Sequence, residues 1–204
     1  MKPVCLFAGL VVASAALLSA TTAMAQGTPT RVRGSISAID GKTVTIATRE
    51  GVPVTVKLAD NWTVALVAPV ALTEIKPNSF VGVASMGSDA DRTALEVLVF
   101  PEAGRGSGEG HYPWDLRAQS TMTNANVEQT AASVDGQTLT LKYKDGEKKI
   151  LVTPDITIVT YVKGDKSEIV PGTKIFIAAA KKQADGTFQT PRINYGKDGL
   201  GPPM

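Results

Sequence analysis

Hydrophobic and polar residues alternate along much of the chain, in short runs separated by turn-forming pairs. Residues Val32 to Ile39 alternate, Asp40-Gly41 follows, and Thr43 to Ile46 alternate again. Alternation with a period of two is typical of a β-strand with one buried face, and a short loop containing Asp-Gly is typical of a β-hairpin. This part of the chain therefore predicts a β-hairpin.

The same pattern recurs in the second part of the chain. Val134, Asp135-Gly136 and the alternating run Thr138 to Leu141 repeat the first hairpin. Further landmarks then follow in the same order in each half. They are Glu50-Gly51 and Asp145-Gly146, Asp60 and Asp155, and Ile75-Lys76-Pro77 and Ile169-Val170-Pro171. The repeat predicts a tandem duplication of one all-β unit.

Each unit is predicted to contain three strands, a connector and two more strands. Leu72 to Pro77 and Ser167 to Pro171, in the connectors, each suit one helical turn that ends at a proline. Five strands with a helical turn after the third are typical of a small OB-type barrel. A short sandwich or another small barrel is the alternative. We expect residues 26–100 and 126–204 to form the two OB-like domains, joined by residues 101–125.

Two of these motifs carry a resemblance to a known group of proteins. The hairpin Val134 to Leu141 and the strand start Ile75 to Asn78 resemble the "V-D-G-x-T-L-T-L" and "I-K-P-G-x-x-V" patterns of exported bacterial proteins built from OB-like domains of unknown function. Asn78 replaces the usual glycine, whereas Gly172 retains it in the second half. The resemblance implies the fold for most of the chain. Its motifs concern turns, so it implies no functional residue.

The N-terminus has the pattern of an export signal. Lys2 precedes an apolar run from Val4 to Leu18, and Ala23-Met24-Ala25 fits a cleavage site before Gln26. We therefore expect residues 1–25 to be a signal peptide, a periplasmic or secreted location, and no membrane span after cleavage. The alternative is an uncleaved anchor, since Val4 to Ala25 is nearly long enough to cross a bilayer.

Composition narrows the possible partners and chemistries. The 204 residues include 21 Lys and Arg, 19 Asp and Glu, one Cys and one His. A balanced, mixed charge does not favour nucleic acid, and single Cys and His residues exclude a disulfide framework or a His-rich metal site. Lysines 142, 144, 148 and 149 fall on one predicted hairpin, where they protect a sheet edge or, alternatively, contact an anionic polymer.

Residues 101–125 have no counterpart in either unit and contain the most distinctive chemistry. Glycines alternate from 104 to 110 beside Arg105, which suits a tether or an anion contact but not a dinucleotide fingerprint. We expect Tyr112 and Trp114 to pack in a crevice between the barrels, with Trp114 as the chief anchor. The segment is therefore predicted to be an ordered crossing.

A possible metal site lies within the same segment. Glu109, His111 and Asp115 place two carboxylates close to the single imidazole, a set that suits an open divalent-metal site or an acid-base pair. The sequence favours the other interpretation, in which His111 caps or hydrogen-bonds a turn, because catalytic zinc sites usually contain at least two His or Cys ligands. Together with Arg105, Tyr112 and Trp114, these three residues form the predicted site.

The sequence favours a noncatalytic binding or envelope-interaction protein. Its partner would be an envelope protein, a polymer or a small ligand, and no cofactor is identified. The alternative is a divalent-metal-handling protein or metal-dependent enzyme that uses Glu109, His111 and Asp115.

Overall fold

The structure, a computed structural model, describes residues 30–202 and is all-β in that range. The predicted signal peptide lies outside the described residues. The only helices within residues 30–202 are three one-turn 3-10 segments, so none there has the length and hydropathy of a membrane-spanning helix. The elements are β1 (Thr30–Asp40), β2 (Thr43–Thr48), β3 (Pro53–Pro69), η1 (Leu72–Glu74), β4 (Phe80–Met86), β5 (Thr93–Val99), η2 (Glu102–Gly104), β6 (Gly110–Pro113), β7 (Thr121–Ser133), β8 (Gly136–Tyr143), β9 (Gly146–Val152), β10 (Thr157–Lys163), η3 (Lys166–Glu168), β11 (Lys174–Lys182) and β12 (Phe188–Tyr195).

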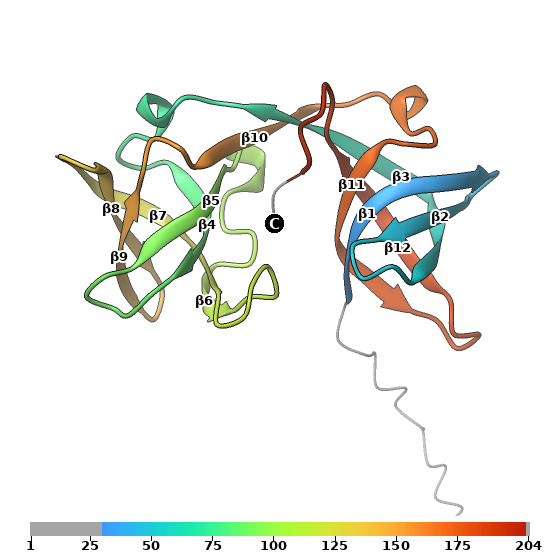
Figure 1. Cartoon of the computed structure of the whole chain (residues 1–204), viewed down its shortest axis with the longest axis horizontal. Helices are drawn as coiled ribbons and strands as arrows, with labels where there is room; N and C mark the ends of the chain where they lie inside the picture. The colour runs from blue at the N-terminus through green and yellow to red at the C-terminus, as the bar shows by residue number, and fades with distance from the viewer. Residues whose placement is uncertain (1–29, 203–204) are drawn as a thin grey trace, which may run out of the picture.

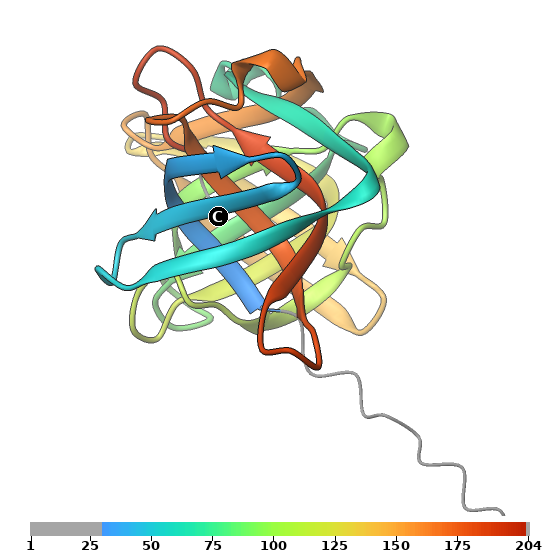
Figure 2. The same cartoon turned by 90° about the vertical axis from the view of Figure 1, so that its right-hand side faces the viewer.

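Five strands from the two ends of the chain close into the first barrel. Strands β1, β2 and β3 form an antiparallel meander, β11 pairs with β1, and β12 pairs with β11. The ring closes where β12 runs parallel to β3. Figure 2 looks onto this barrel, in which the blue and cyan strands β1 to β3 lie beside the orange and red strands β11 and β12.

Five strands from the middle of the chain form the second barrel. Strand β4 lies between β5 and β7, and β8 and β9 continue the sheet beyond β7. The ring closes at one point, where Thr93 of β5 pairs with Leu151 of β9. Strand β6 adds to β7 outside the ring. The two barrels lie side by side in Figure 1.

The strand pairing differs from the prediction that residues 26–100 and 126–204 each form a barrel. Strands β4 and β5 join the barrel of β7 to β9, and β11 and β12 join that of β1 to β3. The long strand β3 explains the exchange, because its end leaves the first barrel and pairs with β10, which in turn pairs with β5 (Figure 1). One continuous sheet therefore links the barrels.

Both predicted hairpins are present, with their turns shifted along the sequence. The residues between the paired strands are Gly41-Lys42 and Val134-Asp135. Gly41 has a φ of 55°, as the tight turn requires. Gly136 starts β8, and a Cβ there would lie 2.2 Å from the carbonyl oxygen of Val152 on β9. Gly136 is therefore needed because the backbones of β8 and β9 approach closely at this position, and not because of the turn itself.

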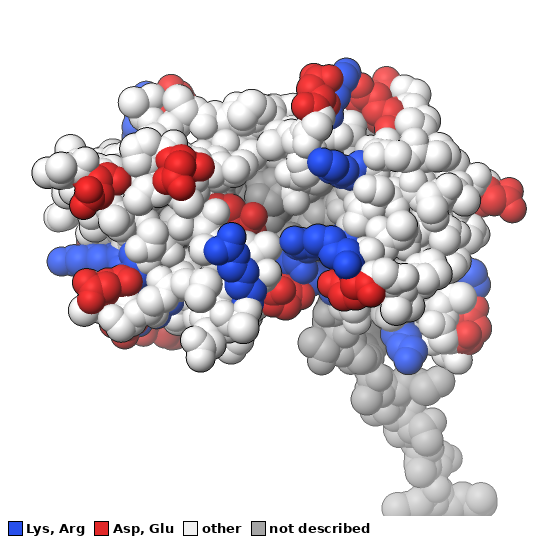
Figure 3. All heavy atoms as spheres, viewed as in Figure 1, with Lys and Arg blue, Asp and Glu red and all other residues white. Residues whose placement is uncertain are grey.

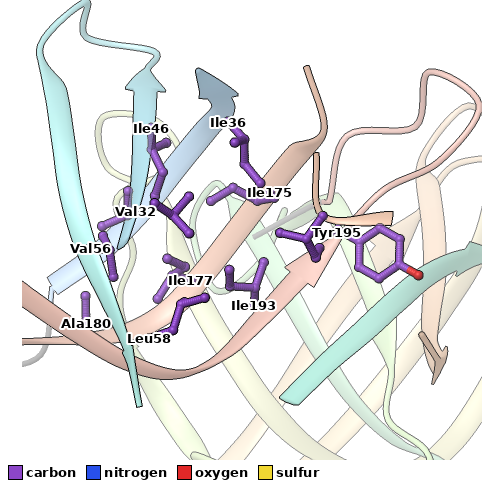
Figure 4. Close-up of a cluster of buried hydrophobic side chains, with 12 residues drawn as sticks. Val32, Ile36, Ile46, Val56, Leu58, Ile175, Ile177, Ala180, Ile193 and Tyr195 are labelled. Atoms are coloured by element: carbon purple, nitrogen blue, oxygen red, sulfur yellow. The ribbon is translucent and has the colours of Figure 1, made fainter. Parts of the chain in front are cut away.

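Three apolar clusters hold the molecule together. Figure 4 shows the cluster inside the first barrel, where Ile46 from the N-terminal meander meets Ile177 and Ile193 from the C-terminal strands. A second cluster fills the other barrel around Leu139 and Ile150. The third lies between the barrels and includes buried Val67, Leu98, Met122, Val159 and Phe176. Burial of such side chains contributes about 1.5–3 kcal/mol each, so the contact between the barrels is part of the core.

Candidate functional site

A cavity of about 530 Å³ lies between the barrels, next to the third apolar cluster. Its volume is in the range of small-molecule sites. Residues of the two barrels, the linking strand β10 and the crossing segment all line it. The lining side chains with aromatic rings or polar groups are Arg31, Phe100, Ser107, Tyr112, Trp114, Asn124, Tyr161, Phe176, Arg192 and Asn194.

The crossing segment forms one wall of this cavity. Strand β6 pairs with β7, so successive side chains of β6 point to opposite faces. Tyr112 lines the cavity, whereas His111 contacts residues of β7 and β8. Gly108 has a φ of 59°, and a Cβ there would lie 3.1 Å from Asn124 Nδ2. Glycine lets this loop close tightly over Asn124.

Trp114 connects the crossing segment with the first barrel. The guanidinium carbon of Arg31, on β1, lies 3.8 Å from the centre of the Trp114 ring, and the ring of Tyr112 lies 6.1 Å away. The backbone N–H of Trp114 donates to Ser120 O at 2.8 Å, and Ser120 Oγ donates back to Trp114 O. These contacts place Trp114 between the barrels.

Asp115 binds arginines of the first barrel. Its carboxylate accepts a hydrogen bond of 2.9 Å from Arg33 Nη2 and lies 3.7 Å from Arg31 Nη1. Burial raises the pKa of Asp115, but the hydrogen bond and the two positive charges outweigh burial and hold the pKa below its usual value. Asp115 therefore acts as a link between the crossing segment and β1.

The other two residues of the predicted metal site have separate partners. His111 Nδ1 hydrogen-bonds Thr123 Oγ1 at 2.8 Å, and its ring stacks on Tyr143 with centroids 6.4 Å apart. Glu109 Oε1 accepts from the backbone N–H of Lys144 at 3.0 Å. Within residues 30–202 no three His, Cys, Asp or Glu side chains gather into a possible metal site. The structure therefore does not assemble the predicted metal set.

Arg105 attaches the start of the crossing segment to the second barrel. Its guanidinium forms two hydrogen bonds of 2.7 Å with the Glu102 carboxylate. It also donates to Asn126 Oδ1 at 2.6 Å and to Asn78 O at 2.9 Å. With these acceptors bound, Arg105 fixes the loop and does not line the cavity.

Two buried polar atoms of cavity-lining residues lack a hydrogen-bond partner among the described residues. Asn124 is 7% exposed, and its Nδ2 donates to Ser107 O at 3.0 Å and to Tyr112 Oη at 3.2 Å. The Ser107 carbonyl can only accept, so the amide orientation is defined and Oδ1 is left without a donor. Trp114 Nε1 is likewise buried without an acceptor. Buried polar groups are normally paired, so these atoms are unusual.

Several lining residues were not predicted from the sequence. Arg192 donates its Nε–H to Asn194 Oδ1 at 2.9 Å, and its guanidinium carbon lies 5.2 Å from the Tyr161 ring centre. Burial raises the pKa of Tyr161 to about 12, although the positive charge of Arg192 acts in the opposite direction. The alternating pattern predicts which face of its own strand each of these side chains occupies. It does not predict that the exchange of strands between the barrels places these faces next to β1.

A second hollow between the barrels lies beside the C-terminal segment. It is lined by Arg33, Arg49, Glu96 and Lys174 together with residues 199–202. Figure 3 shows side chains of both charge signs around a hollow between the barrels. Leu200 packs into the third apolar cluster, and Lys174 Nζ donates to Gly199 O at 3.0 Å. The C-terminal segment therefore packs between the barrels.

Comparisons with known proteins add no assignment. No protein-family model matches the chain, and no curated protein or solved structure matches it significantly. The site must therefore be interpreted from its own geometry.

Proposed function

We propose that this is an exported, noncatalytic protein that binds a small molecule in the cavity between its barrels. The observation that carries the proposal is a cavity with aromatic walls, two of whose lining residues, Trp114 and Asn124, each contain a buried polar atom without a partner. Small-molecule sites combine such apolar walls with a few polar groups that orient the ligand. Both atoms are closed to solvent, so a bound ligand that displaced the side chains covering them would supply the missing partners of Trp114 Nε1 and Asn124 Oδ1.

The chemistry of the lining residues favours binding over catalysis. The titratable side chains that line the cavity are those of two arginines and two tyrosines. Burial raises the pKa of both Tyr112 and Tyr161, so each phenol stays protonated at neutral pH. General acid-base catalysis works best with a group that titrates near the working pH, and these residues do not supply one.

We also infer that the two halves are copies of an OB-like unit and that the protein is periplasmic or secreted. Each half has three strands or their equivalents, a 3-10 turn and two more strands, in the same order. The N-terminal sequence supports export. In this proposal the partner is a small ligand rather than an envelope protein, a polymer or nucleic acid.

A cavity-filling substitution tests the proposed site. Ala178 lines the cavity and is exposed, so Ala178→Phe adds a ring there at little cost to folding. We expect the neutral dye N-phenyl-1-naphthylamine to bind the wild-type chain at one site in a fluorescence titration. Ala178→Phe should weaken this binding at least about tenfold, the effect of losing roughly 1.4 kcal/mol of contacts.

The matched control is Ala131→Phe, which changes an exposed alanine on β7 that does not line the cavity. This variant should bind the dye as the wild type does. Equal binding by all three chains would show that the dye binds elsewhere and would contradict the proposed site.

A further inference from the structure

We propose that the ligand is a planar aromatic acid that also carries a hydrogen-bond donor, such as a hydroxy- or amino-substituted aromatic carboxylate. This inference rests on the proposed function, because it assigns a ligand class to the same cavity. Charge, shape and the two unpartnered polar atoms each contribute to it.

The charges at the cavity favour an anion. Arg31 and Arg192 line it, and no Asp or Glu does. Arg192 takes part in no ion pair within residues 30–202. Arg31 shares Asp115 with Arg33, which makes the shorter contact. Glu96 also acts on Tyr161, yet neither this carboxylate nor Asp115 lines the cavity.

The shape of the walls favours a flat ring system. Trp114 and Tyr112 form a tilted pair, with ring centres 6.1 Å apart. Phe100 and Tyr161 form an edge-to-face pair, with ring centres 6.5 Å apart and planes at 78°. Aromatic rings favour such offset or edge contacts with another ring, so a planar ligand can contact both pairs.

The unpartnered atoms identify complementary groups on the ligand. Trp114 Nε1–H needs an acceptor, and the Arg31 guanidinium lies over the same indole ring. An acid oxygen bound to Nε1–H would therefore also be close to a positive charge. Asn124 Oδ1 needs an N–H or O–H donor. One ligand with an acid group and a donor would satisfy both residues.

Two dyes with the same ring skeleton test the role of the acid group. 1-Anilinonaphthalene-8-sulfonate carries a sulfonate and a bridging N–H, whereas N-phenyl-1-naphthylamine keeps the rings and the N–H but is neutral. With the full mature chain we expect the sulfonate to bind at least about tenfold more tightly, as one or two charge-assisted hydrogen bonds would provide.

Arginine variants locate the effect. Arg31→Gln and Arg192→Gln should each weaken binding of the sulfonate about tenfold and should weaken binding of the neutral dye by a clearly smaller factor, because the neutral dye loses wall contacts but no charge partner. Arg192→Lys, which keeps the charge, should retain most of the affinity. The control is Arg117→Gln, which removes the same charge from an exposed residue that does not line the cavity. Thermal melts of each variant would check that it is folded.

The outcomes separate this inference from the proposed function. Equal affinity for both dyes, or the same loss in Arg117→Gln as in the cavity variants, would overturn the anionic ligand. If the neutral dye still lost affinity in Ala178→Phe, the binding site itself would stand. If neither dye bound the wild-type chain, the proposed function would fail and the ligand class with it.

Discussion

His111 illustrates how a chemically versatile residue is used for structure. Its imidazole is half-buried between Thr123 and the Tyr143 ring, on the side of β6 away from the cavity. Burial lowers its pKa, the positive charges of Arg92 and Lys148 lower it further, and Asp89 opposes them. The fold therefore favours the neutral form of the ring over the protonated form.

This lowered pKa predicts a pH dependence of stability. A group whose pKa is lower in the folded state contributes stability above its unfolded pKa, near 6.5, and that stability is lost as the pH falls through the folded value. We expect the free energy of unfolding to fall as the pH is lowered from 7.5 to 5.5, and the decrease should be small because the ring is partly exposed to solvent.

Urea denaturation of the wild type and His111→Gln at the two pH values measures this effect. His111 is the single histidine in the chain, so the substitution should remove most of the decrease. A decrease of the same size in His111→Gln would assign it to other groups.

The predicted site residues lie in different parts of the structure. The structure places Trp114 and Tyr112 at the cavity between the barrels, where large rings in a glycine-rich segment were expected to pack. Glu109, His111 and Asp115 are close in sequence but lie against different neighbours. Arg31 and Arg192 come from opposite ends of the chain, and only the long-range pairing brings them to one cavity.

At the scale of elements, the alternating pattern identifies strands but not their partners. Both hairpins and the 3-10 turns near Pro77 and Pro171 follow from local sequence. Strand β3 continues to Pro69 and pairs with β10 beyond the first barrel, and no local signal in the sequence predicts this pairing. A period of two gives the buried face of a strand and contains no information on which distant strand lies beside it.

The two hairpin glycines allow a test of strand packing. In Gly136→Ala the new Cβ would lie 2.2 Å from Val152 O and the backbone would keep a φ of 143°. Gly41→Ala is the matched control, because its φ is 55° and no atom lies within 4 Å of the new Cβ. We expect the control to cost about 1–2 kcal/mol and Gly136→Ala to cost clearly more, since β8 and β9 must separate.

Urea denaturation of the two variants measures the difference. Equal losses of stability would mean that β9 does not lie close to β8 at Gly136.

At the scale of the whole molecule, strand exchange makes the barrels interdependent. Each barrel takes three strands from one part of the chain and two from the other, and the third apolar cluster fills the space between them. The cavity exists because residues of both barrels and of β10 meet there. Any change that altered the exchange would therefore also dismantle the proposed binding site.

An engineered disulfide tests the exchange directly. Ser35 on β1 pairs with Lys174 on β11, and Cα atoms of such antiparallel partners lie about 4.5–5.5 Å apart, within the range that a disulfide spans. A chain that starts at Gln26 contains no cysteine, since Cys5 is the only one. Ser35→Cys with Lys174→Cys should therefore form one intramolecular disulfide, which peptide mapping under nonreducing conditions would identify.

The control pairs residue 35 with the position that sequential barrels would place beside it. If residues 26–100 formed a barrel alone, Phe80 at the start of β4 would take the place of Lys174 at the start of β11, so Ser35→Cys with Phe80→Cys would cross-link instead. We expect this pair to stay reduced, because β4 lies in the other barrel beside β7. Efficient cross-linking of 35 with 80, and none of 35 with 174, would show that each half closes on itself and that the cavity between exchanged barrels does not form.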